Sequence, residues 1–298
     1  MTEDSLVTKN RAPVRWKEIE IPVRGCKISL DKIKTIYREL SDINRSFGEK
    51  MIANLDRDTN MSDDEWENHK SWLLDDAFCL TISINGQKDQ QLYAETVDIF
   101  DDPYLPFPLE TIFFTNVNSY RRHASGELPT NQVSVYLDFG KPDIVDPKAV
   151  VSAATPNAGH VAVKAEDIAF YNAIQKSVEQ SLTSHRTWYS PIHRNLSYDL
   201  GLLLVILPAA FYFSAYFMDQ IIPADSNHMI YRWPLFMYFV FLSFIVYRMF
   251  TSYLKWAFPV NVLVENKDKA HFHRLFLGGI ITWLFYQFAN TVYHLIVG

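Results

Sequence analysis

Cysteine is scarce in this chain, which has two such residues, Cys26 and Cys79, among its 298. Secreted domains that depend on disulfides use many more, so a disulfide scaffold is excluded. We therefore expect both thiols to be reduced, as they are in the cytosol. Residues 1–20 also lack the apolar core of a signal peptide, and we expect no secretory leader at the N-terminus.

An excess of positive charge is missing from the first two thirds of the chain. Residues 1–195 contain 22 of the 28 Lys and Arg residues but 29 of the 34 Asp and Glu residues. Nucleic-acid binding needs a cationic surface that displaces counterions, so this acidic part argues against a nucleic-acid partner. Residues 196–298 contain few charges of either sign and have the composition of a membrane domain.

The familiar catalytic motifs are absent as well. The sequence has no GxxxxGK[ST] or GxGxxG phosphate loop, no GxSxG, no HExxH and no CxxC. His271 and His273 are two residues apart, but no carboxylate or thiol accompanies them, so we expect neither a metal nor another cofactor. No convergent set of groups indicates a catalytic residue, and we expect the protein not to be an enzyme.

Three long apolar runs are present instead, at about 198–218, 233–254 and 275–297. A helix needs roughly 20 mostly apolar residues to cross a membrane. These runs therefore predict an all-α bundle of three transmembrane helices over residues 198–298. Buried helices of a soluble protein are a less favoured interpretation, because the three consecutive runs share one charge bias.

Basic residues near the runs predict the orientation, since cytoplasmic loops are enriched in Lys and Arg. The loop between the first and second runs has only Arg232. The other two connections have more basic residues: Arg186, Arg194, Lys255, Lys267, Lys269 and Arg274. We therefore expect an integral membrane protein with its N-terminus in the cytoplasm and its C-terminus outside.

The third run contains a polar stripe, which consists of Gln287, Asn290, Thr291 and His294. Their spacing of i, i+3, i+4 and i+7 places them on one helical face. Small residues that permit close helix packing lie nearer the start of this run: Gly278, Gly279 and Thr282. The stripe either bonds to the other spans of the same chain or faces another protomer, as an oligomer seam or the lining of a water-filled path.

Residues 1–188 have the pattern of a cytosolic α+β domain, an antiparallel sheet with helices that cover one face. Apolar residues at helical spacing predict helices at about 30–55, 62–75 and 166–184. Alternating apolar residues predict strands at about 19–23, 78–84, 91–100, 110–120, 132–140 and 160–165. A basic junction at 189–197 then leads into the membrane domain.

One concentrated cationic group is present in this domain. Arg121, Arg122 and His123 follow the strand expected at 110–120. Such a group can receive an anion or an acidic partner. The alternative interpretation is a solvated strand end beside Glu127.

Residues 150–205 resemble a class of uncharacterised bacterial inner-membrane proteins with a cytosolic α+β domain. The resemblance is carried by the segments SAATPNAGHVAVKAEDIAFYNAIQKSVEQSL and HRNLSYDLGLLL. Members of that class have a Pro-Thr-Pro-Asn loop, a strand, an amphipathic helix and a basic junction into a Tyr-Asp-Leu span; the loop here reads Ala-Thr-Pro-Asn. The resemblance implies a bacterial membrane protein and supplies neither an activity nor catalytic residues.

These observations favour a membrane effector or sensor. Its cytosolic domain would bind an unidentified cytosolic protein or signal. Its helices would contact membrane lipid and self-associate as a homo-oligomer, as in anti-phage and other self-limiting systems. The alternative is a membrane-anchored scaffold that recruits a cytosolic protein. A third hypothesis, less favoured, is a membrane enzyme that acts on a lipid or polymer precursor.

Overall fold

The computed structural model of the chain describes residues 15–56, 61–144, 154–182, 186–224, 227–266 and 270–297. The chain divides into two compact units. The sheet unit consists of Met1–Gly140, Asn157–Thr187 and Asn261–Lys267, and the helical unit consists of Lys141–Pro156, Trp188–Val260 and Asp268–Gly298. The short segment Asn261–Lys267 therefore belongs to the sheet unit, although the chain on both sides of it belongs to the helical unit.

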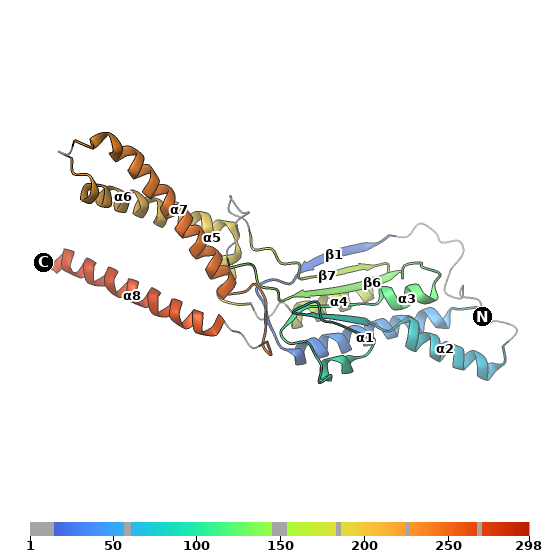
Figure 1. Ribbon diagram of the computed structural model, residues 1–298. Helices are drawn as coiled ribbons and strands as arrows, with labels where there is room; N and C mark the ends of the chain where they lie inside the picture. The colour runs from blue at the N-terminus through green and yellow to red at the C-terminus, as the bar shows by residue number, and fades with distance from the viewer. Residues whose placement is uncertain are drawn as a thin grey trace. The chain divides into compact units, whose positions relative to one another are not determined.

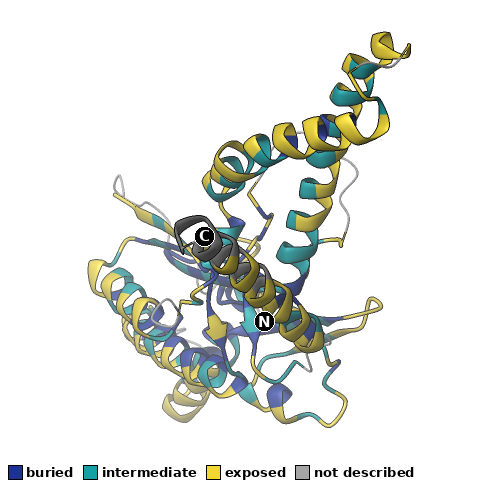
Figure 2. Cartoon of the chain, turned by 90° about the vertical axis from the view of Figure 1, so that its left-hand side faces the viewer, coloured by how far each residue is buried: buried dark blue, intermediate teal, exposed yellow. Residues whose placement is uncertain are grey.

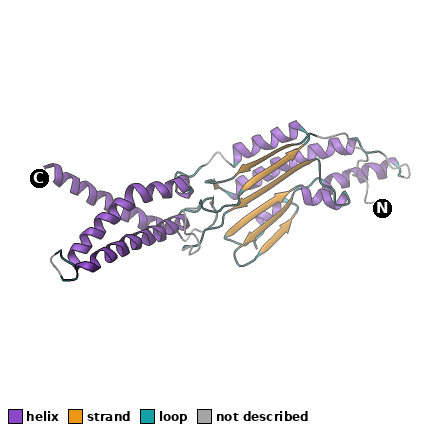
Figure 3. Ribbon diagram, turned by 90° about the horizontal axis from the view of Figure 1, so that it is seen from above, coloured by secondary structure: helices purple, strands orange, loops and turns teal. Residues whose placement is uncertain are grey.

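The sheet unit is built on a six-stranded sheet with the strand order β1-β7-β6-β5-β3-β4. Each neighbouring pair runs antiparallel, as the sequence predicts (Figures 1 and 3). The strands are β1 (Lys17–Pro22), β3 (Thr81–Gly86), β4 (Gln91–Ala94), β5 (Leu109–Thr115), β6 (Asn131–Asp138) and β7 (His160–Ala165).

The helices of the sheet unit begin where the sequence signals them. They are α1 (Leu30–Ala53), α2 (Asp63–Ala77), α3 (Val117–His123) and α4 (Ile168–Ser181). Ser29 caps α1 by accepting a hydrogen bond from the Lys32 amide. Ser62 and Glu65 form a reciprocal capping box at the start of α2. The helices α1, α2 and α4 confirm the three expected helices, and their ends agree to within about three residues. The helix α3 was not expected.

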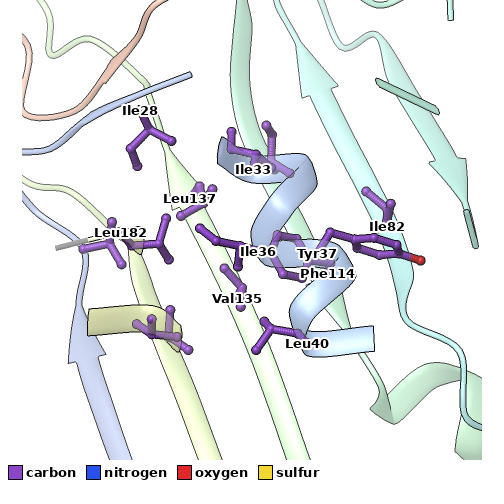
Figure 4. Close-up of a cluster of buried hydrophobic side chains, with 14 of the residues drawn as sticks. Ile28, Ile33, Ile36, Tyr37, Leu40, Ile82, Phe114, Val135, Leu137 and Leu182 are labelled. Atoms are coloured by element: carbon purple, nitrogen blue, oxygen red, sulfur yellow. The ribbon is translucent and has the colours of Figure 1, made fainter. Parts of the chain in front are cut away.

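The core lies between one face of the sheet and the helices α1 and α4. Ile33, Ile36 and Leu40 of α1 are fully buried, and Figure 4 shows them beside Phe114 of β5 and Val135 of β6. Burial of each such side chain contributes about 1.5–3 kcal/mol. On the other face of the sheet, side chains such as Phe113 and Tyr136 are only half-buried.

The strand expected at 110–120 was wrong in its second half, where residues 117–123 form α3. The cause is the side chain of Asn116. Its amide donates to the Asn131 carbonyl at 2.8 Å and accepts from the Val133 amide at 3.0 Å, so it occupies groups of β6 that a continuing strand would use. The chain then leaves the sheet, and the Tyr120 amide donates to the Asn116 carbonyl in the first turn of α3.

The strand expected at 91–100 ends at Ala94, and Val97–Asp101 form the 3₁₀ helix η1. The Glu95 carbonyl accepts a hydrogen bond from the Tyr37 hydroxyl at 2.9 Å instead of continuing the strand ladder. Tyr37 comes from α1, so the end of this edge strand is determined by a residue 58 positions away in the sequence.

Within its described residues, the helical unit contains two helical segments long and apolar enough to cross a membrane, Asn195–Ile221 and Met229–Ala257. Only 11% and 6% of their most apolar windows are buried within the chain, unlike the core helices of soluble proteins (Figure 2). The first comprises α5 (Asn195–Gly201), the π-helical η3 (Leu202–Ile206) and α6 (Leu207–Ile221). The second comprises the 3₁₀ helix η4 (Met229–Tyr231) and α7 (Arg232–Ala257).

The third apolar run forms α8 (Ala270–Val297), a helix of 28 residues. Its length at about 1.5 Å per residue suffices for a bilayer core. That it crosses the membrane as a third span stays a prediction. A further 3₁₀ helix, η2 (Ser190–His193), precedes α5 in the junction that the sequence places at 189–197.

A π-helical segment interrupts the first of these helices. It ends at Ile206, two residues before Pro208, which cannot donate its own backbone hydrogen bond and crowds the preceding turn. Gly201, just before this segment, is needed for close packing because an added Cβ would lie 2.3 Å from the Tyr247 hydroxyl of α7. That hydroxyl donates to the Tyr198 carbonyl at 3.0 Å, which fastens α5 to α7.

Gly48 in α1 supports a test of the helix packing in the sheet unit. A Cβ at this position would lie 2.5 Å from the ring of Phe78, and that ring is held edge-on by Phe47 and Tyr120. We expect Gly48→Ala to lower the local unfolding free energy of α1 and α2 by about 1–3 kcal/mol, despite the better helix propensity of Ala. Hydrogen exchange of the two helices measures the change.

The control is the double variant Gly48→Ala/Phe78→Leu, in which the smaller side chain makes room for the new methyl group. The two substitutions should cost less together than the sum of their separate effects. Additive costs would show that the contact with Phe78 is not the cause.

Candidate functional site

Four segments of the sheet unit meet at Asn261, the residue that follows the last turns of α7 by a few positions. Its side-chain amide donates to the Val23 carbonyl at 2.8 Å and to the Asp138 carbonyl at 3.0 Å. Its side-chain oxygen accepts from the Cys26 amide at 3.1 Å. The side-chain amide of Asn261 also donates to the side-chain oxygen of Asn157 at 3.2 Å. We call this group of five residues the Asn261 clamp.

The partners of Asn261 are bound to one another as well. The Asn157 side chain donates to the Asp138 carbonyl at 3.1 Å and accepts from the Gly159 amide at 3.0 Å. Asn261 itself is only 1% exposed. A buried polar network of this kind is stable only when its members are satisfied, so the clamp has little freedom to open partially.

The residues after Asn261 continue into the fold of the sheet unit. Val262 and Leu263 form β8, which pairs in parallel with Lys27 and Ile28 of β2. The Leu263 side chain is buried in the main core. The connection between α7 and α8 is therefore a structural element of the sheet unit as well as a loop.

Asn266 makes a second attachment to the sheet. Its side-chain amide donates to the Leu109 carbonyl at 2.9 Å, and its side-chain oxygen accepts from the Leu109 amide at 2.9 Å. This pair of bonds imitates one rung of a β-ladder at the start of β5. The six residues from Asn261 to Asn266 are thus held at both ends.

The sequence predicts a basic loop between the second and third apolar runs, at 255–274, with no strand or helix in it. One signal was present in the run PVNVLVEN, which is rich in Val and typical of a strand rather than of a solvated loop. The partners could not be read from it, because β2 and β5 lie more than 150 residues away in the sequence.

The cationic group Arg121, Arg122 and His123 lies in the last turn of α3. Arg122 pairs with Glu95 at 2.8 Å, and His123 lies 2.7 Å from Asp76. The Arg121 side chain donates to the Gly126 carbonyl at 3.3 Å. Glu95 offsets the charge of Arg122, whereas Arg121 meets a neutral carbonyl. That the group binds an anion or an acidic partner stays a prediction.

The two cysteines are free in the structure. Burial raises the pKa of the Cys26 thiol and also that of the Cys79 thiol. A raised pKa leaves less of the thiolate that acts as a nucleophile or metal ligand. Neither cysteine therefore has the environment of an activated nucleophile.

The polar stripe lies in the second half of α8, whose helical geometry places Gln287, Asn290, Thr291 and His294 on one face. Gln287 and Asn290 are exposed, whereas the side chains of Thr291 and His294 lie outside the part of the chain that is described. The stripe's role as a seam, a path lining or an intramolecular contact stays a prediction.

The two glycines of α8 have open space beside them within the described chain. A Cβ added at Gly278 or at Gly279 would meet nothing within 4 Å. The Thr282 hydroxyl donates to the Gly278 carbonyl of its own helix at 2.9 Å. No packing within the described residues therefore requires these glycines to lack a side chain.

His273 is engaged by aromatic residues rather than by other metal ligands. Its Nδ1 lies 2.7 Å from the Tyr253 hydroxyl, and its ring meets Trp256 edge-on. Among the described residues, no three His, Cys, Asp or Glu side chains are grouped so that they could hold a metal ion.

His193 is a buried histidine that the sequence analysis does not single out. Its Nδ1 lies 2.9 Å from the Thr155 hydroxyl, and the Thr155 amide donates to the His193 carbonyl at 3.2 Å. Burial lowers the pKa of His193 to about 4, with a smaller contribution in the same direction from Lys255 and an opposing one from the Phe258 backbone. The imidazole is therefore neutral at physiological pH.

No protein-family model, no curated protein and no solved structure matches this chain. The resemblance of residues 150–205 to bacterial inner-membrane proteins accordingly stays a prediction, and the functional argument rests on the contacts described above.

The Asn261 clamp yields a direct test. Asn261→Leu would leave the Val23 carbonyl and the Cys26 amide without these partners, whereas the Asp138 carbonyl would keep the hydrogen bond from Asn157. Each buried group without a partner costs about 1–3 kcal/mol. We expect local opening of β2 and β8 to become easier by at least about 2 kcal/mol, as measured by hydrogen exchange on the full chain.

The matched control is Asn54→Leu. Asn54 is exposed and donates to the Lys50 carbonyl of its own helix at 2.8 Å. Its replacement should leave exchange in β2 and β8 unchanged. Equal effects of the two substitutions would mean that the hydrogen bonds of Asn261 do not hold this segment in place.

Because His193 is buried and neutral, we expect the local stability of the junction to depend on pH. The histidine of an opened chain takes up a proton below about pH 6.5, whereas the buried one does so only near pH 4. The opened state therefore binds more protons between these values, and local stability falls as the pH falls through this window. We expect the opening constant of residues 188–194 to rise by up to about tenfold per pH unit.

The measurement is hydrogen exchange between pH 7.5 and 4.5, corrected for the intrinsic exchange rates. His193→Gln cannot titrate and should abolish the additional opening, whereas His160→Gln in the sheet unit should retain it. The same pH dependence in the His193→Gln variant would exclude His193 as its source.

Proposed function

We propose that this protein is a non-enzymatic effector or sensor of a bacterial inner membrane. In this proposal the sheet unit lies in the cytoplasm and binds a protein partner or a signal. The apolar helices, α8 included as a third span, lie in the membrane with the C-terminus outside. They self-associate and change the permeability of the membrane when the sheet unit is engaged.

The observation that supports this proposal best is the Asn261 clamp. The segment that it holds continues directly into α8 and follows directly from α7. A shift of the sheet unit at β2 or β5 therefore acts on the ends of two apolar helices through a few covalent bonds. A plain anchor requires one connection between a soluble domain and its helices, whereas here the chain returns to the sheet unit between α7 and α8.

The attachment also supports the proposed orientation. The sheet unit and the α7–α8 connection must lie on the same side of the membrane, because they form one folded unit. This connection carries the basic residues that favour the cytoplasm. At the α6–α7 turn, Arg232 pairs with Asp219, so its charge is offset. The α7–α8 connection is therefore more positive than the α6–α7 turn at the other end of the helices.

Self-association is supported by the surface of α8. Polar side chains within hydrocarbon seek hydrogen-bond partners, and small residues let helices approach closely. Gln287 and Asn290 are exposed, and Gly278 and Gly279 have open space around them. A second copy of α8 would supply both kinds of contact. An effector that acts on its own membrane suits anti-phage and other self-limiting systems, which is where we place this protein.

The first experiment measures membrane potential and dye entry in cells that express the protein. We expect the wild type to depolarise cells and the variant Gln287→Leu/Asn290→Leu/His294→Leu to lose this effect, because its α8 can no longer form polar contacts within the membrane. Expression levels must be matched by immunoblotting of the membrane fraction.

The control variant alters exposed apolar residues on the same helix: Phe276→Leu/Ile280→Leu/Trp283→Leu. It should depolarise cells as the wild type does. Depolarisation by the polar-stripe variant at the wild-type level would contradict the proposed role of the stripe. Full function after exchange of the apolar helices for unrelated ones would instead favour the membrane-anchored scaffold.

A further inference from the structure

The C-terminal end of α7 and the first turns of α8 are fastened together within the helical unit. The Arg274 side chain donates from Nε to the Ala257 carbonyl at 2.7 Å, which satisfies one of the free carbonyls at the end of α7. The Tyr253 hydroxyl lies 2.7 Å from Nδ1 of His273. Ala257 and Ala270 are fully buried beside these contacts.

Two cationic side chains lie on aromatic rings at this end. The guanidinium of Arg274 lies 5.5 Å from the ring centre of Phe258, and the Lys141 ammonium lies 5.5 Å from that of Trp256. Trp256 also stacks on Tyr253 at 5.9 Å. Each cation is thus positioned by a cation–π contact at the end of an apolar helix.

Large apolar side chains are exposed around these cations. Trp188 is 82% exposed and contacts Phe258, and Phe272 of α8 is 74% exposed. Aromatic side chains at the end of an apolar helix are typical of the interface between hydrocarbon and headgroups. The cations therefore lie at the depth of lipid phosphates if the helices span a membrane.

The charges at this end are complementary to an anionic surface. The described cations of the helical unit near it are Lys141, Arg194, Lys255 and Arg274, with Arg248 further into α7. The described acids of the same unit are Asp143, Asp199 and Asp219, and the last of these pairs with Arg232 at the other end of the helices. Among the described residues of the helical unit, cations therefore outnumber acids at this end.

We infer that Lys141 and Arg274, positioned on Trp256 and Phe258, form a binding site for the headgroup of an anionic phospholipid. The ligand is a lipid rather than a free phosphate because exposed apolar side chains adjoin the cations and match the acyl chains. This inference rests on the proposed membrane insertion. It adds to the proposed function a lipid class that the helical unit selects.

The test uses the full chain in phosphatidylcholine nanodiscs that contain a fraction of phosphatidylglycerol. Brominated phosphatidylglycerol or brominated phosphatidylcholine quenches nearby tryptophans, and Trp188 and Trp256 lie at the site. We expect the wild type to be quenched preferentially by the anionic lipid. Each juxtamembrane cation contributes about a fivefold preference, so Lys141→Gln/Arg274→Gln should weaken binding roughly 25-fold.

Two further variants keep the test independent of folding. Arg274→Lys retains the charge and should retain most of the preference, and Arg232→Gln, at the other end of the helices, should retain all of it. Equal quenching by both lipids in the wild type would overturn the inference. Loss of the preference in 20 mM inorganic phosphate, on the order of a saturating concentration for a weak anion site, would also overturn the inference. The ligand would then be phosphate itself.

The outcomes also separate this inference from the proposed function. A wild type that inserts and depolarises cells but is quenched equally by both lipids would refute the lipid site alone. A wild type that inserts and prefers the anionic lipid but leaves cells polarised would refute the effector alone. Failure to insert into any nanodisc would refute both.

Discussion

The hydrogen bonds of Asn261 determine how this chain is organised. One side chain joins backbone groups of Val23 and Cys26, between β1 and β2, and of Asp138, at the end of β6, to the segment between two apolar helices. The cost of leaving those buried groups without partners is several times the thermal energy for each group, so the segment stays with the sheet unit. The other attachments, the β2–β8 pairing and the bonds of Asn266, act in the same direction. The division into a charged part and an apolar part is therefore a division in composition and not in chain order.

Local sequence signals determine most helices and strands of the sheet unit, and these elements could be predicted from the sequence. Ser29 and Ser62 cap helices because their hydroxyls satisfy free amides, which depends only on residues three positions away. Alternation identified β6 and β7 because one face of each strand packs on the core. The same local reasoning identified two helices that can span a membrane, because length and apolar content need no knowledge of partners.

The parts of the fold that could not be predicted from the sequence depend on residues that are distant along the chain. Asn116 ends β5 by bonding to β6, and Tyr37 ends β4 by bonding to Glu95, so alternation alone extended both strands too far. Asn261 and Asn266 resemble ordinary loop residues until β2 and β5 are placed beside them. His193 is buried by Thr155 and by the chain after α7, and no local pattern marks it. The polar stripe differs from these cases, since helical spacing alone defines its face, although not what contacts it.

The insertion of β8 into the sheet unit also constrains how the protein is made. Leu263 and Asn261 leave the ribosome after the apolar helices α6 and α7. The sheet unit emerges first, yet its core and its clamp are complete only after those helices have been synthesised. Synthesis of the two apolar helices thus precedes the final folding of the unit that emerges before them. Until Asn261 and Leu263 have left the ribosome, the sheet unit lacks its clamp and part of its core, so it completes its fold only when it is already linked to both helices.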